Sequence, residues 1–451
     1  MTKPKVVSLF SGAGGLDLGF SNAGFEIIGA ADAHPAAVAT YNHNLGRHAH
    51  LVDVTQSDFS DFLDSVGACD LLLGGFPCQG FSKAGPKRKD DLRNSLYVAM
   101  IEAMRVLQPS IFLAENVDGL SQNYSGAILE QIVSDCEQVG YSVQWKIVDA
   151  EWFGVPQHRR RVFIVGVRSD LVERVRFDWP VAEHWPVRRN GERDWAMDYP
   201  SWAPDEELRP PKTLREAIAG AEGQSDHVVK KVGDEKAAQI LRHIGPGKKL
   251  CNARHDATSV KTWDIPEVYG PTSSRERLVL ETIARNRRHK KWGSIPNGNP
   301  LPRTAISVLA GIEVTHKELV DLKKRGFLKT AGGKWDIVGA MFASGYYKRP
   351  ELDLPSPTVL TGFHDARFMA HPIENRPFSI REVARIQTFP DDFEFLGAGI
   401  TIESAYMLIG NAVPPKLAFA MAISIREALE AHKPQITNYN QTDVDSTCIA
   451  V

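Results

Sequence analysis

The sequence has few cysteines and no long apolar run. Its five cysteines, at positions 69, 78, 136, 251 and 448, form no CxxC pair. Their spacing argues against a zinc knuckle or a disulfide framework and suits a reducing cytoplasm. No apolar stretch approaches the length of a membrane helix, and the residues before the first predicted strand contain no signal-peptide core. We therefore expect neither a membrane partner nor export.

Net charge is also nearly absent, at −2 for 451 residues, so the whole-chain value gives no hint of a polyanionic partner. The distribution is uneven, because residues 275–334 contain fourteen Lys/Arg and five Asp/Glu. Such a zone fits a solvated face as well as a nucleic-acid surface. The length predicts two domains, or one large domain with an insertion. The hydrophobic content of 43% and charged content of 24% are typical of a soluble globular protein.

A strand, a glycine-rich turn and a helix open the chain. Residues 5–10 are a predicted buried strand, Ser11-Gly12-Ala13-Gly14-Gly15 is the turn, and residues 16–20 begin the helix. Glycines let the backbone approach a ligand closely. The turn has neither the GxGxxG spacing nor the lysine of a P-loop. The pattern therefore predicts a nucleotide-type cofactor site that need not hold phosphates.

Acidic residues follow the next two predicted strands. Asp32 ends a strand over residues 25–31, where a carboxylate suits a ribose diol. Asp53 lies in a third strand end, residues 51–55, and could accept from an adenine amino group. Each acid alone is more often a helix cap. Ligand-compatible residues at three successive strand ends predict an adenosine-containing cofactor.

A cysteine follows the fourth predicted strand. The buried run 71–73 stops at Gly74-Gly75-Phe76-Pro77-Cys78, and a cysteine on such a turn could be a nucleophile. A lone cysteine is, however, more often an inert small hydrophobe. The loop after it, residues 80–94, is long and basic, as active-site lids often are. The next predicted strand, 110–114, ends at Glu115, which should face the same sheet edge as Cys78.

Six stretches, in order, resemble the motifs of the DNA (cytosine-5) methyltransferase family, in its bacterial restriction–modification form. They are Phe10-Ser11-Gly12-Ala13-Gly14-Gly15, Gly74-Gly75-Phe76-Pro77-Cys78-Gln79, Glu115-Asn116-Val117, Gln157-x-Arg159-x-Arg161, Arg381-Glu382-x-x-Arg385-Ile386-Gln387-Thr388-Phe389-Pro390 and Gly410-Asn411-x-Val413-Pro414-Pro415. The resemblance spans about residues 6–431 except the middle. It implies an α/β fold with a doubly wound, mostly parallel, Rossmann-like sheet, and a second, smaller and irregular DNA-recognition domain.

The resemblance also implies a mechanism. The Cys78 thiolate would add to carbon 6 of a cytosine that has been flipped out of the duplex, and carbon 5 would then take up a methyl group. Glu115 would protonate or hydrogen-bond ring nitrogen N3. Arg159 and Arg161 would stabilise charge on the base carbonyl. For these arginines, a phosphate contact or a salt bridge is the alternative, and one of the two could do only that.

The implied methyl donor is S-adenosylmethionine, and no metal is expected. The cofactor contacts that the resemblance implies are Phe10 on the adenine, Gly12 and Gly14 beside the methionine part, Asp32 on the ribose, Asp53 on the adenine amino group, and Leu96 and Asn411 lining the pocket. The family often has Glu at the position of Asp32.

We expect residues 1–180 to form the catalytic domain, completed by a returning helix over 405–432. Residues 181–404 would form the target-recognition domain, and 433–451 a disordered tail. Within the recognition region, helical patterns at 276–290, 304–309 and 316–325 precede a strand, glycine turn and strand over 326–337. Residues 275–338 thus resemble a winged helix-turn-helix, and an insertion that never touches bases is an equal alternative. The expected DNA contacts are Ser82, Lys83, Arg287, Arg288 and Lys291.

Other functions fit the sequence less well. A cytosine-5 tRNA methyltransferase shares the catalytic layout, but the Cys-Phe-Thr signature of that branch is missing from this sequence. A catalytically dead DNA-binding protein would not need Cys78, Glu115 and Arg161. A nicotinamide oxidoreductase would need a pyrophosphate turn. We therefore predict a bacterial cytoplasmic enzyme that acts as a monomer on double-stranded DNA, paired with a restriction endonuclease or solitary.

Overall fold

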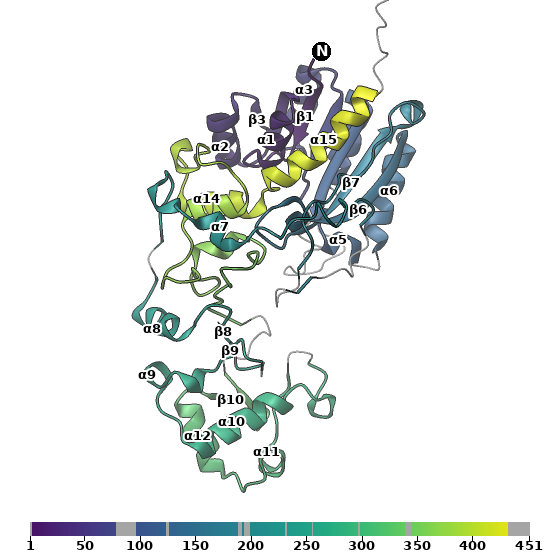
Figure 1. Cartoon of the computed structure of the whole chain (residues 1–451). Coiled ribbons are helices and arrows are strands. Elements are labelled where there is room, and N and C mark those ends of the chain that lie inside the picture. Colours follow the sequence, from purple (N-terminus) through teal and green to yellow (C-terminus); the bar gives the residue numbers. More distant parts are fainter. Residues whose placement is uncertain are drawn as a thin grey trace, which may run out of the picture.

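A seven-stranded sheet forms the centre of the upper lobe (Figure 1). In the computed structural model its strands are β1 (Lys5–Leu9), β2 (Glu26–Asp32), β3 (Ala49–Leu51), β4 (Leu71–Gly74), β5 (Ile111–Val117), β6 (Tyr141–Asp149) and β7 (Arg160–Arg168). Their spatial order is β3-β2-β1-β4-β5-β7-β6. β7 runs antiparallel to β5 and β6, whereas the other neighbours are parallel. The predicted mostly parallel α/β sheet is confirmed.

The structure describes residues 2–77, 96–122, 126–187, 192–193, 199–230, 232–254, 256–295, 298–338 and 345–431. The predicted tail, 433–451, lies outside these residues, as do Cys78 and the loop that follows it.

Helices cover both faces of the sheet. The helices of this domain are α1 (Gly15–Asn22), α2 (Pro35–Leu45), α3 (Asp58–Val66), α4 (Tyr97–Leu107), α5 (Gly119–Gln122), α6 (Ala127–Gln138) and α15 (Pro415–Ala431). Val6 of β1 packs in a core with α1 and α15, while Val7 packs in a second core with α3, α4 and α6. Successive strand residues point to opposite faces, so one short strand serves both cores.

The last helix, α15, packs against the first helix, α1. A Cβ at Gly19 of α1 would collide with Ala418 and with the backbone of α15. Glycine therefore sets the spacing between the two helices. Contrary to the expectation that no apolar stretch approaches the length of a membrane helix, the stretch Ile402–Ala431 is long and apolar enough to cross a membrane by length and composition. It folds as α14 (Ile402–Asn411) and α15, and 61% of its most apolar part is buried in the core.

The chain after β7 first adds to the catalytic core. Ala182 and Tyr199 are buried there, and Tyr199 and Trp202 pack on Trp152. The hydrophobic core on the seven-stranded sheet therefore extends past residue 180, where we expected the first domain to end. Beyond it come α7 (Leu214–Ile218), η8 (Thr361–His364) and α13 (Ile380–Ile386), which with α14 build a third core that also contains Ala13 and Ala37.

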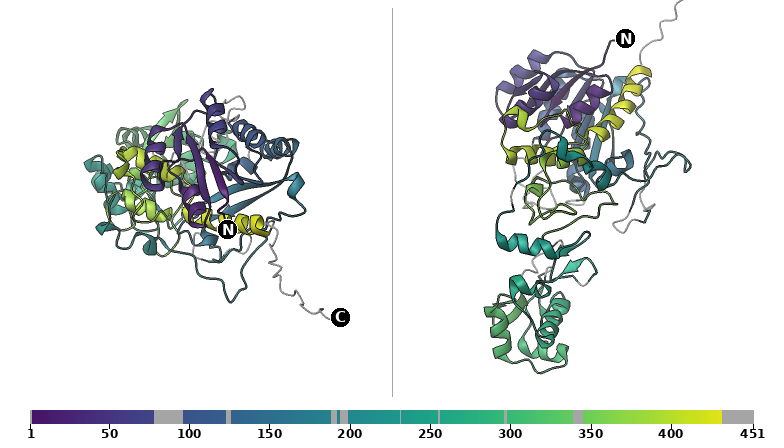
Figure 2. Two further views of the ribbon diagram at one scale, coloured as in Figure 1. Left: turned by 90° about the horizontal axis from the view of Figure 1, so that it is seen from above. Right: turned by 60° about the vertical axis from the view of Figure 1, so that its left-hand side comes forward.

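A separate lobe lies below the rest of the molecule (Figures 1 and 2). Between the two lie α8 (Glu235–His243), β8 (Lys249–Leu250) and β9 (Ser259–Val260). The lobe itself contains α9 (Pro266–Tyr269), α10 (Ser274–Asn286), α11 (Arg303–Ala310), α12 (His316–Lys324), β10 (Leu328–Ala331) and β11 (Lys334–Ile337). It has its own hydrophobic core. The three helices and the strand pair fall where the sequence predicts them.

Candidate active site

The glycine-rich turn after β1 has an unusual backbone. Phe10 and Gly12 both have φ of 56°, and Gly14 has φ of 87°. A positive φ is uncommon for a residue such as phenylalanine and often marks a functional site. A Cβ on Gly14 would strike Tyr41 and Leu45 of α2, whereas one on Gly12 would meet no described atom within 4 Å. Gly14 is therefore needed for packing, and Gly12 is the glycine that borders open space.

Asp32 joins this turn to the end of β2. Its carboxylate accepts from the Gly12 amide at 2.9 Å and from the His34 amide at 2.8 Å. Burial raises the pKa of this carboxyl above its ordinary value. The nearby Ser11 Oγ is buried and has no hydrogen-bond partner within the described parts of the chain. A free buried hydroxyl beside a fixed carboxylate fits a polar ligand such as a nucleoside.

The remaining predicted cofactor residues are arranged less tightly. Asp53 is exposed, and its carboxylate accepts from the Thr55 amide and hydroxyl, which lowers its pKa. Asn411 is exposed at the end of α14, and the next residues, Ala412 and Val413, lie against Gly15 of the turn. Leu96 is half-buried just before α4. Tertiary folding thus brings the segment after Asn411 to the glycine turn.

Sequence reasoning missed Asp17, which is fully buried beneath the turn. Its carboxylate accepts from Ser8 Oγ at 3.0 Å and from the Tyr41 hydroxyl at 3.2 Å. Burial raises its pKa to about 6. The side chain therefore ties β1, α1 and α2 together below the glycine-rich turn. An acid in the first turn of a helix gives no sequence signal of burial.

The end of β4 meets β5 at the site of the predicted nucleophile. Cys78 lies outside the described residues, as do Ser82 and Lys83. The preceding Phe76 is buried, and its carbonyl accepts from Asn116 Nδ2 at 3.0 Å. A Cβ on Gly74 would strike Met100 of α4, whereas one on Gly75 would lie 3.7 Å from Glu115. Gly74 thus serves helix packing, and only Gly75 faces the acid.

Glu115 and Arg161 form a buried ion pair. Both lie inside strands, Glu115 on β5 and Arg161 on the adjacent β7, rather than after a strand end as we expected for Glu115. Arg161 Nε and Glu115 Oε1 are 2.8 Å apart, and the two side chains are 11% and 10% exposed. Burial raises the pKa of Glu115, although Arg161 and Arg159 oppose that shift. The arrangement can hold a proton on a carboxyl beside a fixed positive charge.

Arg159 contacts backbone carbonyls of the returning chain. Its fully buried guanidinium donates to the carbonyls of Val359, Gly410 and Ala412 at 2.8–3.0 Å. Gln157, also fully buried, donates to Ile386 and accepts from the Val359 amide. These contacts join β7 to the chain returning through α13 and α14. We therefore assign Arg159 to positioning, whereas Arg161 contacts Glu115 directly.

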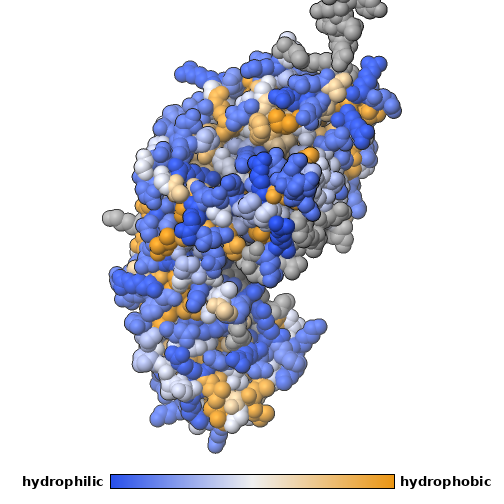
Figure 3. Space-filling model, viewed as in Figure 1, coloured by the Kyte–Doolittle hydropathy of each residue, from blue (hydrophilic) through white to orange (hydrophobic). Residues whose placement is uncertain are grey.

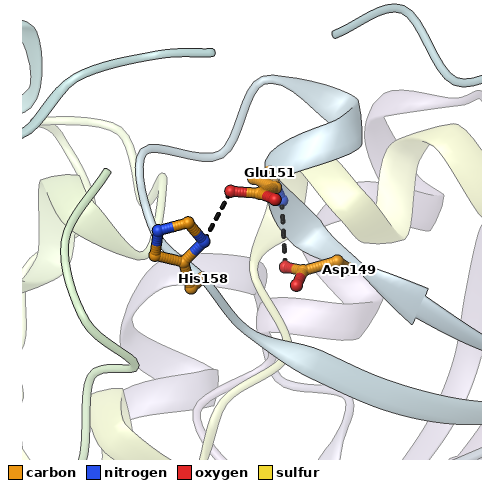
Figure 4. Close-up of side chains that lie close together, drawn as sticks. All are labelled: Asp149, Glu151 and His158. Carbon is orange, nitrogen blue, oxygen red and sulfur yellow. Dashed lines mark hydrogen bonds and ion pairs between the residues drawn. The ribbon is translucent and has the colours of Figure 1, made fainter. Parts of the chain in front are cut away.

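Three side chains near Arg159 lie close enough to share a cation: Asp149, Glu151 and His158, whose ligand atoms are all within 4.8 Å of one another (Figure 4). They are already engaged. His158 Nδ1 pairs with Glu151 Oε2 at 2.6 Å, and Asp149 Oδ1 accepts from the Arg159 amide at 2.9 Å. Burial raises the pKa of Asp149 to about 7, with Glu151 adding to the shift. The group thus fixes the backbone that carries Arg159.

The predicted DNA contacts in the lower lobe fall into two kinds. The structure corrects the prediction that Arg287 contacts DNA. Arg287 is 4% exposed, and its guanidinium donates to both carboxylate oxygens of Asp336, at 2.7 and 2.8 Å. The Arg287 side chain is therefore not available to bind a DNA phosphate. Arg288 and Lys291 are exposed.

A model of the C-5 cytosine-specific DNA methylase family matches residues 4–427. The chain belongs to this family. It is a DNA (cytosine-5) methyltransferase of the class that uses S-adenosylmethionine.

Two curated members of the family illustrate the likeness. M.AgeI, a Type II methyltransferase of Thalassovita gelatinovora, is 31% identical over 94% of this chain and 100% of the relative. M.DdeI, a Type II methyltransferase of Desulfomicrobium norvegicum, is 31% identical over 92% of this chain and 87% of the relative. A crystal structure of a prophage-encoded DNA modification methyltransferase (E. coli) has a TM-score of 0.52 at 22% identity, covering 95% of this chain and 100% of that chain. The last comparison shows the shared fold.

Proposed function

We propose that the buried pair of Glu115 and Arg161 activates a flipped cytosine for attack by Cys78. The 2.8 Å contact between the two side chains, next to Gly75, is the observation that carries this assignment. A thiolate adding to carbon 6 leaves negative charge on the ring, which a proton at N3 neutralises. A glutamate whose pKa is raised by burial retains that proton. Arg161 then faces the carbonyl side of the base.

The covalent steps balance without a redox partner. Cys78 sulfur would bond to carbon 6 as N3 takes a proton from Glu115, and carbon 5 would then take the methyl group, whose bond to the sulfonium sulfur of S-adenosylmethionine breaks to leave S-adenosylhomocysteine. A base then removes the carbon 5 proton, the sulfur–carbon bond breaks, and the thiolate is returned. The base must leave the duplex stack for its carbon 6 to reach a side chain. No step needs a metal.

S-adenosylmethionine supplies the methyl group when it is bound. Asp32 would hold the ribose hydroxyls, and Gly12 and Ser11 would accommodate the ligand, because the space at Gly12 is open and Ser11 Oγ lacks a partner among the described residues. Phe10 would face the adenine. Asp53, Leu96 and Asn411 remain proposed contacts at the rim.

The assay that tests this assignment uses labelled S-adenosylmethionine with duplex DNA in one arm and transfer RNA in the other. We expect label in DNA only, on carbon 5 of cytosine. Cys78→Ser should abolish transfer and leave cofactor binding nearly unchanged, since a serine hydroxyl is a far weaker nucleophile. Label in RNA alone would move the enzyme to the tRNA branch, and full activity of Cys78→Ser would rule out the proposed nucleophile.

We also infer that the enzyme modifies a specific sequence in the bacterial cytoplasm as the partner of a restriction endonuclease. The named relatives are Type II methyltransferases, which supports this role. Bisulfite sequencing of DNA from an expressing host should show complete methylation of one short sequence. Protection of that DNA from an endonuclease encoded beside the gene would separate a paired enzyme from a solitary one.

A further inference from the structure

The lower lobe has the element order of a winged helix-turn-helix. After α10, Leu301 forms two backbone hydrogen bonds with Trp335 of β11, both 2.8 Å, so a short extended segment joins the β10–β11 pair. Then follow α11, α12 and the β10–β11 hairpin. Helix, extended segment, helix, helix, strand and strand is an arrangement in which the last helix is the one offered to a DNA groove.

A buried ion pair and a common core fix this arrangement. Arg287, just after α10, bonds Asp336 of β11, with side chains 5% and 7% exposed. Ile283 of α10, Leu319 of α12 and Ile337 of β11 share the core of the lobe. The buried face of α12 therefore fixes the helix in the lobe, and its opposite face is exposed to solvent.

The open side of α12 borders a hollow of about 520 Å³, shared with the β10–β11 hairpin. His316, Val320, Lys323 and Lys324 line it from the helix, at the spacing of one helical face. Thr330, Gly332 and Gly333 line it from the hairpin. Lys323 Nζ donates to Thr330 Oγ1 at 2.8 Å across the hollow. The hairpin turns through Gly332 and Gly333, both at positive φ, so no side chain blocks its tip.

This surface is positively charged. Residues 316–338 contain six Lys/Arg and three Asp/Glu, and two of the three acids are engaged, Glu318 with Arg275 and Asp336 with Arg287. Lys317 and Lys334 are exposed and make no ion pair with any described residue. Lys324 lies 4.0 Å from Asp321 and is 74% exposed. Exposed lysines on a helix and an adjoining hairpin suit phosphates.

We propose that α12 and the tip of the β10–β11 hairpin bind duplex DNA as a winged helix-turn-helix module, with α12 in the major groove and Lys317, Lys324 and Lys334 on phosphates. The inference rests on the proposed function, since it adds a second DNA contact to the same enzyme. It leaves out Arg287, whose guanidinium is engaged by the buried pair with Asp336.

Protein docking is the competing use of this lobe. Its lower end shows an apolar area (Figure 3), and the exposed side chains of α11 include Val308, at 81%, and Leu309, at 37%. These two apolar residues belong to α11, whereas Lys323 and Lys324 of α12 line the hollow. The cations favour a polyanion on α12.

The test compares two triple variants of the full chain. The first is Lys317→Ala, Lys324→Ala and Lys334→Ala. The matched control removes the same charge elsewhere, with Lys3→Ala, Arg105→Ala and Arg174→Ala, all exposed and near the sheet edge opposite the glycine turn. Binding to a duplex of about 30 base pairs is measured from 50 to 300 mM salt, in the presence of S-adenosylhomocysteine.

We expect the first variant to bind at least about tenfold more weakly at low salt. Its plot of log affinity against log salt should flatten by about 0.9 for each phosphate that the variant no longer neutralises. The control should match wild type. At saturating DNA, kcat should be unchanged, because the three lysines lie far from the Glu115 pair. Equal affinity and equal salt slopes in all three proteins would overturn the proposal.

Lysine acetylation read by mass spectrometry gives a measurement on the unmodified enzyme. Duplex DNA should protect Lys317, Lys324 and Lys334 and leave Lys3 reactive. If added DNA left the acetylation of all three lysines unchanged, the proposal would also be overturned. A wild-type protein that binds DNA through these lysines but transfers no methyl group would instead count against the proposed function.

Discussion

At the scale of single residues, the decisive feature is a carboxyl group buried beside a guanidinium. A buried charge is costly unless it is paired, and Glu115 is paired with Arg161 while burial still raises its pKa. Burial raises the pKa of Glu115 and the neighbouring guanidinium lowers it. Because the net shift is upward, the carboxyl group can give its proton to a ring nitrogen. Neighbouring Asn116 holds the Phe76 carbonyl, so the same strand also fixes the backbone leading to Cys78.

Replacing Glu115 with Gln tests this role. The amide keeps a hydrogen-bond donor but cannot transfer a proton, so we expect kcat to fall by roughly 10²-fold or more, with cofactor affinity nearly unchanged. Because the acid acts in its protonated form, wild-type kcat should decline as pH rises through the raised pKa. The kcat of the Glu115→Gln variant should not decline with pH in this way. A variant with wild-type kcat and pH profile would contradict the assignment.

Asp17 predicts a pH dependence of stability. Burial raises its pKa from 3.8 to about 6, so the folded protein keeps a proton that the unfolded chain releases between those values. The contribution of Asp17 to the free energy of unfolding is therefore full below pH 4 and falls by about 3 kcal/mol as pH passes 6. Asp17→Asn should gain stability relative to wild type over this range in urea unfolding. A constant difference between the two proteins would contradict the prediction.

At the scale of elements, glycine decides how closely α1 and α15 approach. A methyl group at Gly19 would collide with Ala418 and with the backbone at Phe419. We expect Gly19→Ala to lower the free energy of unfolding by about 1–3 kcal/mol, because the added carbon overfills a packed contact. Gly223→Ala is the matched control, since no described atom lies within 4 Å of its Cβ and its φ is ordinary. Equal stability of the two variants would mean that the helices can separate at no cost.

The Arg287–Asp336 pair makes a similar prediction for the lower lobe. Asp336→Asn leaves a buried guanidinium without its charge partner, which should destabilise the protein by about 3 kcal/mol. Asp321→Asn, at a side chain that is 50% exposed, should change stability by less than about 1 kcal/mol. Denaturant unfolding followed by tryptophan fluorescence, to which Trp335 of that core contributes, measures both. If the Asp336→Asn variant were as stable as wild type, the ion pair would not be needed for stability.

At the scale of the whole molecule, the cofactor site and the lower lobe are built on different cores. We therefore expect hydrogen exchange to report two separate responses. S-adenosylhomocysteine should slow exchange in residues 10–15 and 32–36, and leave the amides of α12 unchanged. Added duplex DNA should slow exchange in α12 as well. Protection of α12 by the cofactor alone would indicate coupling between the lobes that the separate cores do not predict.

Much of the design could be predicted from the sequence because it is local. A short apolar run and the glycines after it identified β1 and its turn, and Ser379 with Glu382 forms a capping box, itself a short local pattern, at the start of α13. The helices and hairpin of the lower lobe also follow from short patterns. Motif order was sufficient to place Glu115 near the chain leading to Cys78, because parallel strands end at one sheet edge.

Other roles depended on contacts between residues far apart in the chain. Arg159 reaches Val359 and Gly410, which are 200 and 251 residues away, and no spacing rule predicts such partners. Arg287 was predicted to be a surface cation, but it pairs with Asp336 of β11. Nothing in the sequence marked Asp17 as buried, because the contact with Tyr41 of α2 depends on the tertiary fold. The sequence by itself determined the family, the sheet and the chemical groups of the site. Only the tertiary structure decided which charges are buried, since burial is set by what packs over a side chain.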